Sequence, residues 1–175
     1  DEDALNEGFM FDGSSIAGWK AINESDMTLM PDLYRAYVDP FFAQPTLALF
    51  CDVLEPSSGE AYDRDPRGTA KAALAHIETL GIADTAFFGP EAEFFIFEDV
   101  KIDVSMNRGL YSVDSVEGPY NSARKYGEGN LGHRPGVKGG YFPVPPVDSG
   151  QDIRSEMLSV MADMGVAVEK HHHEV

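Results

Sequence analysis

The sequence contains a single cysteine, few basic residues and no long apolar run, and each shortage excludes a class of protein. Cys51 alone cannot form an internal disulfide, which favours a cytoplasmic protein over a secreted one. The 13 Lys and Arg stand against 30 Asp and Glu, a formal net charge of −17. Nucleic-acid phosphates and anionic lipids repel such a chain, so we expect neither as a partner. No stretch approaches the roughly 18 apolar residues of a membrane span.

The composition is that of a folded chain. With 175 residues, 43% hydrophobic and 11% aromatic, the chain can form one domain, or one domain and part of a second. The chain begins at Asp1 rather than at Met and ends at Val175, directly after a cluster of histidines, so we expect a fragment. The Pro, Ser and Gly residues at 55–59 mark a candidate domain boundary.

Strand and helix signals along the chain predict an α+β fold. The first third is typical of strands and turns, with a strong turn signal at Asp12-Gly13-Ser14-Ser15. A helix is predicted between Asp65, as its N-cap, and Gly81, which sits where a C-terminal glycine belongs. A second helix is predicted from near Ser149 to Gly165, with apolar residues at helical spacing.

Each predicted helix is followed by a predicted strand with carboxylates. We expect strands at 85–88, 91–97 and 166–170, and we expect residues 100–150 to be mostly loop. The pair Gly139-Gly140 in this loop allows the backbone to approach a ligand closely. Two acidic strand ends are therefore expected to converge.

Glu91 and Glu93 are the sharpest chemical feature. Residues two apart on a strand point to the same face, so the two carboxylates lie side by side in an apolar context. Two such carboxylates stay ionised together only with a compensating charge, and no basic residue lies within this strand. The oxygen ligands favour Mg²⁺ or Mn²⁺. The alternative is an edge strand on which Glu91 and Glu93 occupy the solvent-exposed face.

The run His171-His172-His173-Glu174 leaves three interpretations open: a purification-tag remnant, a solvated strand end, or a site for metal or phosphate. On a regular strand His172 and Glu174 share one face, and Glu169, His171 and His173 share the other. Glu169 and Glu174 could therefore contact one ligand only through a bulge or through the backbone.

Six stretches, taken together, resemble bacterial glutamine synthetase of the dodecameric type. They occur in the family order and span nearly the whole chain. They are Phe11-Asp12-Gly13-Ser14-Ser15-Ile16, Asn23-Glu24-Ser25-Asp26-Met27, Tyr62-Asp63-Arg64-Asp65-Pro66, Gly89-Pro90-Glu91-Ala92-Glu93-Phe94-Phe95, Lys138-Gly139-Gly140-Tyr141-Phe142-Pro143-Val144-Pro145-Pro146 and His171-His172-His173-Glu174-Val175.

The resemblance implies a partial β-grasp domain at 1–62, followed by the truncated N-terminal part of the glutamine synthetase catalytic α/β domain at 63–175. It also implies a site that holds two Mg²⁺ or Mn²⁺ ions. Glu91, Glu93 and Glu174 fall on the metal-binding glutamates of that family.

The remaining implied roles concern ATP and ammonium. Glu169 falls on an ATP-contacting position. Asp12 falls on the acidic residue that reaches into a neighbouring subunit's site and handles ammonium. Ser15 and Tyr141 match other residues that line the ammonium pocket.

The reaction that the resemblance implies is the ATP-dependent ligation of ammonia to glutamate through a γ-glutamyl phosphate. Glutamate, ammonium and ATP are then the substrates, and a homo-dodecamer is expected for the intact protein. We expect the fragment alone to be inactive, because further site elements of the family lie beyond Val175. Two alternatives stay open: a related glutamate–amine ligase, and a non-catalytic acidic module for metal binding or assembly.

Overall fold

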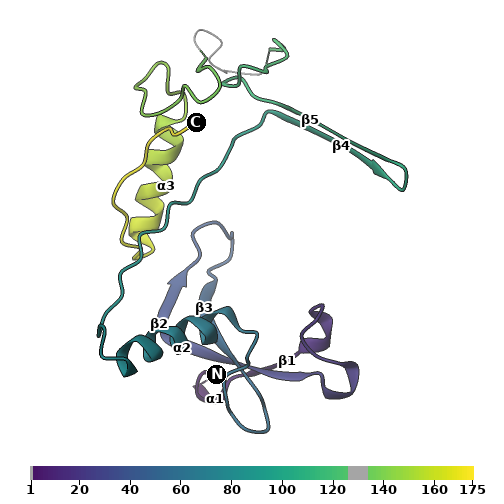
Figure 1. The fold of residues 1–175 in the computed structure, drawn as a ribbon, viewed down its shortest axis with the longest axis vertical. Coiled ribbons are helices and arrows are strands. Elements are labelled where there is room, and N and C mark those ends of the chain that lie inside the picture. The colour runs from purple at the N-terminus through teal and green to yellow at the C-terminus, as the bar shows by residue number, and fades with distance from the viewer. Residues whose placement is uncertain (1, 126–133) are drawn as a thin grey trace. The chain divides into compact units, whose positions relative to one another are not determined.

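The computed structural model describes residues 2–125 and 134–175, and the chain forms two compact units, Asp1–Pro90 and Glu91–Val175 (Figure 1). Helices occur together with antiparallel sheets, which confirms the predicted α+β class. The two units divide after Pro90, while the domain boundary between residues 62 and 63 stays a prediction. No helix within the two described ranges is long and apolar enough to cross a membrane.

A three-stranded antiparallel sheet builds the first unit. Its strands β1 (Phe9–Asp12), β2 (Asp26–Val38) and β3 (Leu47–Leu54) lie in the order β1-β2-β3. The register between β2 and β3 shifts between Pro31 and Ala36. The strand β2 continues through Pro31 to Val38. An irregular ladder next to the proline accommodates its missing N–H.

The hydrophobic core of the first unit lies against this sheet. Its buried side chains are Met27, which is fully inaccessible, Val53 and Tyr62. The partly buried side chains packed against them are Phe11, Trp19 and Leu29. The Tyr62 hydroxyl donates a hydrogen bond to the backbone oxygen of Trp19 at 2.5 Å, so this buried hydroxyl is satisfied.

Short helical elements flank the sheet. The helix α1 (Glu2–Glu7), which the sequence patterns did not predict, precedes β1. Two 3₁₀ turns, Gly13–Ser15 and Ile22–Glu24, lie between β1 and β2.

The helix α2 (Pro66–Thr79) begins and ends where the sequence predicted. Asp65 caps its first turn by accepting a hydrogen bond from the N–H of Arg67 at 3.0 Å. Gly81, with a positive φ of 64°, follows its last turn. The cap residue, the proline at the first turn and the C-terminal glycine therefore all have the predicted positions.

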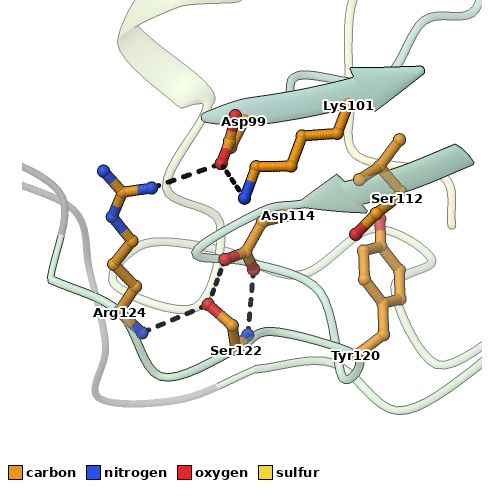
Figure 2. Close-up of a pocket in the computed structure, with 8 residues that line it drawn as sticks. Asp99, Lys101, Ser112, Asp114, Tyr120, Ser122 and Arg124 are labelled. Atoms are coloured by element: carbon orange, nitrogen blue, oxygen red, sulfur yellow. Dashed lines mark hydrogen bonds and ion pairs between the residues drawn. The ribbon is translucent and has the colours of Figure 1, made fainter. Parts of the chain in front are cut away.

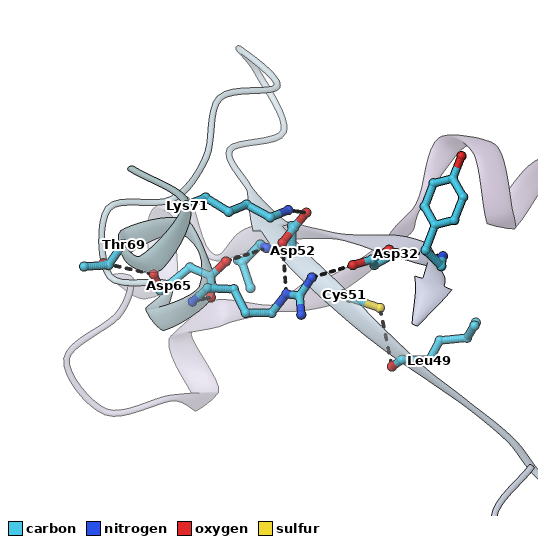
Figure 3. A network of polar contacts seen from close by, with 10 residues as sticks. Asp32, Leu49, Cys51, Asp52, Asp65, Thr69 and Lys71 are labelled. Carbon is cyan, nitrogen blue, oxygen red and sulfur yellow. Dashed lines mark hydrogen bonds and ion pairs between the residues drawn. The ribbon is translucent and has the colours of Figure 1, made fainter. Parts of the chain in front are cut away.

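Ion pairs fasten the start of α2 to the sheet (Figure 3). Arg67 donates to Asp32 on β2 at 2.7 Å and to Asp52 on β3 at 3.1 Å, and Lys71 also pairs with Asp52. Burial raises the pKa of Asp52, but the hydrogen bonds from Lys71 and Arg67 outweigh it and hold this pKa below the usual value. The network joins two strands to the helix through charged groups rather than through apolar packing.

The second unit contains a two-stranded hairpin and one helix. The strands β4 (Asp99–Ser105) and β5 (Arg108–Asp114) pair antiparallel around a two-residue turn at Met106-Asn107. Sequence analysis predicted mostly loop over 100–150, which is wrong over the hairpin; residues 126–133 of that prediction lie outside the described part of the chain. The helix α3 (Gln151–Asp163) ends just before Gly165, whose φ is 83°, close to the predicted bounds.

Three predicted strands are absent. Residues 85–88, 91–97 and 166–170 form neither helix nor strand. The sequence pattern there favours an extended backbone, but a strand also needs a neighbouring backbone to hydrogen-bond with, and none pairs with these segments in the described ranges. The rings of Phe95 and Phe97 stack at 6.3 Å, as expected for residues two apart in an extended chain.

Candidate functional site

Asp12 lies at the end of β1, where the chain enters the turn Gly13–Ser15. Its carboxylate accepts hydrogen bonds from the hydroxyl and the backbone N–H of Ser14, at 2.6 and 2.9 Å, and from the hydroxyl of Ser15 at 3.1 Å. The Ser14 hydroxyl, followed by the Ser14 N–H, lowers the pKa of Asp12 below its usual value. The predicted turn is present, and it holds an exposed, ionised carboxylate that suits a small cation.

The turn that carries Asp12 rests directly on the core. Gly13 is buried, and a Cβ atom at this position would lie 2.6 Å from the Cγ atom of Met27. The N–H of Gly13 also donates to the backbone oxygen of Ser25 at 2.7 Å. Close backbone approach to a fully buried side chain therefore fixes the direction in which the chain leaves β1.

Glu91 and Glu93 lie in the irregular segment that begins the second unit. Both residues are exposed. The structure assigns neither carboxylate a hydrogen bond or an ion pair with any described residue. The oxygens of both residues are therefore available to an external ligand.

The segment His171–Glu174 is not a strand. Ring nitrogens of His171 and His173 contact Arg154 and Gly140 of the second unit. Nδ1 of His172 lies 3.3 Å from Oε2 of Glu174. The division of the segment into two faces requires a regular strand and therefore stays a prediction.

Tyr141 lies next to this segment. Its ring meets the imidazole of His172 edge-on at 5.7 Å, and the ring of Phe142 lies 5.5 Å from the same imidazole. The N–H of Phe142 donates to the backbone oxygen of His173 at 2.9 Å. The structure thus brings Tyr141 and Glu174, which come from distant parts of the sequence, into contact with the same imidazole, that of His172.

The predicted metal ligands fit a divalent cation by their chemistry, and they are not gathered around one point. Exposed carboxylate oxygens without ion pairs, such as those of Glu91 and Glu93, suit Mg²⁺ or Mn²⁺. Glu174 is also exposed, with His172 as its neighbour. Among residues 2–125 and 134–175, however, no three His, Cys, Asp or Glu side chains lie close enough to hold a metal together.

Glu169 lies in the irregular chain after α3 and is exposed. The structure does not place it in the group formed by Tyr141, His172 and Glu174, and its predicted contact with ATP stays a prediction. Ser15 donates a hydrogen bond to Asp12, and its predicted place in an ammonium pocket stays a prediction.

The residues that support the histidine segment, His171–Glu174, were not predicted from the sequence. Asp148 is almost completely buried and pairs with Arg154 of α3, which in turn contacts His171. Glu117, in the turn after β5, faces His173. No local signal marked Arg154, because α3 also carries the charged residues Asp152, Glu156 and Asp163.

A separate pocket of about 180 Å³ lies at the base of the hairpin (Figure 2). Asp99 pairs with Lys101 and Arg124 there, and Asp114 accepts hydrogen bonds from Ser122. None of the predicted site residues lines this pocket. The charged side chains of this pocket pair with one another and link the hairpin to residues 122–124.

Comparison with known proteins identifies the relatives of the chain. Residues 1–56 match the family described as "Glutamine synthetase, beta-Grasp domain", and residues 63–175 match "Glutamine synthetase, catalytic domain". Over all 175 residues, the chain is 68% identical to a glutamine synthetase of Azospirillum brasilense and 65% identical to one of Rhizobium meliloti. It spans 37% of the length of each relative.

A solved structure supports the same relationship. The cryo-EM structure of Plasmodium falciparum glutamine synthetase matches the whole chain with a TM-score of 0.76 at 25% sequence identity, over 34% of its own length. The two matching domain families occur in the order that the sequence predicted. The chain therefore belongs to the glutamine synthetase family, with a β-grasp segment followed by part of the catalytic domain.

Proposed function

We propose that the chain supplies part of the active site of an enzyme that ligates ammonia to glutamate with ATP, through a γ-glutamyl phosphate. The observation that carries this proposal is the grouping of Tyr141, His172 and Glu174, because it joins a predicted ammonium-pocket residue to a predicted metal ligand. Membership of the family supports the reaction type. The proposal concerns the whole protein, because this chain spans 37% of the length of its relatives.

The carboxylates of Glu91, Glu93 and Glu174 would hold two Mg²⁺ or Mn²⁺ ions. Such ions reduce the repulsion between ATP and the glutamate carboxylate and stabilise the charge that develops on the transferred phosphoryl group. Glu169 would contact the nucleotide. The net charge of −17 supports a role for cations, because ATP would otherwise meet a strongly acidic protein.

Asp12, with Ser15 and Tyr141, would bind ammonium. Hydrogen bonds from Ser14 and Ser15 keep the Asp12 carboxylate ionised, and an ionised carboxylate attracts ammonium and can accept its proton before ammonia attacks. The aromatic face of Tyr141 is exposed and can pack against a small cation. We further propose that the protein acts in the cytoplasm as a homo-oligomer, a dodecamer, in which Asp12 serves a neighbouring subunit.

The experiment uses a complete enzyme, made by joining this chain to the remaining part of the Azospirillum brasilense relative. Product formation is measured with glutamate, ATP and Mg²⁺ or Mn²⁺, with ammonia or a series of polyamines as the amine. We expect glutamine, with one phosphate released per turnover. Formation of a glutamyl-polyamine instead would favour the related glutamate–amine ligase, and absence of any product would contradict the proposal.

A further inference from the structure

The segment His171–Glu174 is held at two points by side chains that carry no predicted role in the reaction. The imidazole of His171 contacts α3, and that of His173 contacts Gly140 and Glu117. Each is engaged through both of its ring nitrogens. Side-chain contacts therefore fix the position of this segment, which pairs with no described strand.

The first attachment is at His173. Its Nδ1 atom donates a hydrogen bond to the backbone oxygen of Gly140 at 2.6 Å, and its Nε2 atom lies 3.1 Å from Oε1 of Glu117. The Oε1 atom is buried and accepts no hydrogen bond from any described residue, so the His173 ring at 3.1 Å is the polar group that faces it. Loss of the imidazole would remove this neighbour from a buried carboxylate oxygen, which is costly.

The second attachment is at His171. The Nε atom of Arg154 donates to Nδ1 of His171 at 3.2 Å, so the ring hydrogen is on Nε2, which lies 3.1 Å from the hydroxyl of Ser155. Arg154 is itself fixed by its ion pair with the buried Asp148. The first turns of α3 therefore form a rigid support for this imidazole.

Steric fit at Gly140 reinforces the first attachment. A Cβ atom at this position would lie 2.6 Å from Cε1 of His173 and 2.7 Å from the carbonyl carbon of Val175. The loop backbone thus contacts the segment on both sides of Glu174. A side chain at position 140 would therefore displace the segment.

We propose that Glu117 and Arg154 are positioning residues that act through His173 and His171 to aim the Glu174 carboxylate toward a bound divalent cation. The inference rests on the proposed function, because it takes Glu174 as a ligand. Neither residue touches the cation or a substrate. Their effect is to set which side chains of the segment face the site, namely those of His172 and Glu174.

The test measures the dissociation constant of Mn²⁺ by calorimetry in the complete enzyme, together with the thermal midpoint, kcat and KM for glutamate. Glu117→Leu removes the carboxylate that faces the imidazole, and Glu117→Gln keeps a polar group of the same size there. Ser155→Ala is a milder change at the second attachment. Ser159→Ala, one turn further along α3 and without contact to the segment, is the matched control.

We expect Glu117→Leu to weaken Mn²⁺ binding about tenfold, as loss of outer partners of metal ligands typically does. Glu117→Gln should restore most of the affinity, Ser155→Ala should weaken it about threefold, and Ser159→Ala should leave it unchanged. A lower thermal midpoint with unchanged Mn²⁺ affinity would mean a structural role only and would overturn the inference. If Glu117→Leu does not fold, Arg154→Lys decides, because lysine lacks the planar guanidinium that bonds both His171 and Asp148: unchanged Mn²⁺ affinity in Arg154→Lys overturns the inference.

The outcome for the unmodified enzyme separates this inference from the proposed function. If that enzyme neither binds Mn²⁺ nor forms product, the proposed function fails and the inference fails with it. If it binds Mn²⁺ and forms glutamine while the variants bind Mn²⁺ equally well, only the positioning role is wrong.

Discussion

The carboxylate of Asp65 joins Val53 to the start of α2. One of its oxygens accepts a hydrogen bond from the N–H of Val53 at 3.2 Å, and the other accepts one from the N–H of Arg67 at 3.0 Å. Asp65 is buried, and Val53 is one of the three core residues of the first unit. A single side chain therefore caps the helix and fastens it to β3.

Replacing Asp65 should destabilise the first unit. Asp65→Ala removes a helix cap and leaves the buried N–H of Val53 without its acceptor, so we expect a loss of about 1–3 kcal/mol in the free energy of unfolding. Asp65→Asn keeps one oxygen acceptor and should lose less. Urea denaturation followed by circular dichroism measures both, and equal stability of Asp65→Ala and the unmodified chain would contradict this role.

Removing the Ser14 hydroxyl should raise the pKa of Asp12 toward its usual value, because that hydroxyl is the main cause of the shift. NMR titration of the Asp12 carboxyl carbon in Ser14→Ala measures it, with Ser159→Ala as control. The pKa of Asp12 is lower in the folded chain than in the unfolded chain, where it is about 3.9. The ionised carboxylate therefore stabilises the fold at pH values above the unfolded pKa. This contribution is lost as the pH falls through the folded pKa. An identical titration curve in Ser14→Ala would refute the assignment.

Removing a predicted metal ligand should raise the metal requirement of the complete enzyme. In Glu91→Ala or Glu174→Ala, the Mn²⁺ concentration for half-maximal activity should increase sharply, by at least about tenfold. Glu156→Ala, an exposed glutamate on α3, is the matched control. Unchanged metal dependence in both variants would count against the ligand assignment.

A methyl group at Gly140 should displace the histidine segment. Gly140→Ala places a Cβ atom 2.6 Å from the His173 ring, whereas Gly136→Ala meets nothing within 4 Å. We therefore expect Gly140→Ala to lose most glutamine-forming activity in the complete enzyme and Gly136→Ala to retain it. Equal activity of the two variants would show that the close approach at Gly140 is dispensable.

The 175-residue chain alone should form no glutamine. No three potential metal ligands are gathered in the described ranges, and the chain spans 37% of its relatives. Incubation of the purified chain with glutamate, ATP, ammonia and Mn²⁺, followed by amino-acid analysis, provides the measurement. Sustained glutamine formation would overturn this prediction.

Helices were predictable from sequence because their signals are local. Asp65 and Gly81 bound α2 through contacts within a few residues. At the end of α3, the N–H of Val166 donates to the oxygen of Met161 at 2.9 Å, and Gly165 supplies the left-handed residue this ending needs. Neither helix depends on a distant segment for its bounds.

Strands were less predictable because pairing is not local. Residues 91–97 have the composition of a strand but pair with no described neighbour, whereas β4 and β5 pair with each other around a two-residue turn. The alternation of apolar side chains at Val100, Ile102 and Val104 was the signal for this hairpin. The Gly- and Pro-rich sequence that follows it obscured that signal.

The turn at Asp12 was predictable from the sequence, and the contacts that support the histidine segment were not. Glu91 and Glu93 stand out by residue type and spacing and Glu174 by the family resemblance, and their roles as metal ligands stay predictions. Glu117 and Arg154 could not be recognised, because their contacts with the histidines span 56 and 17 positions, and nothing in the local sequence of either residue indicates its partner.

The two anchored imidazoles make the segment sensitive to its length as well as to its composition. An extra residue between His171 and His173 would prevent both rings from keeping their partners at once. We therefore expect natural variants of this segment to keep both histidines and the single residue between them.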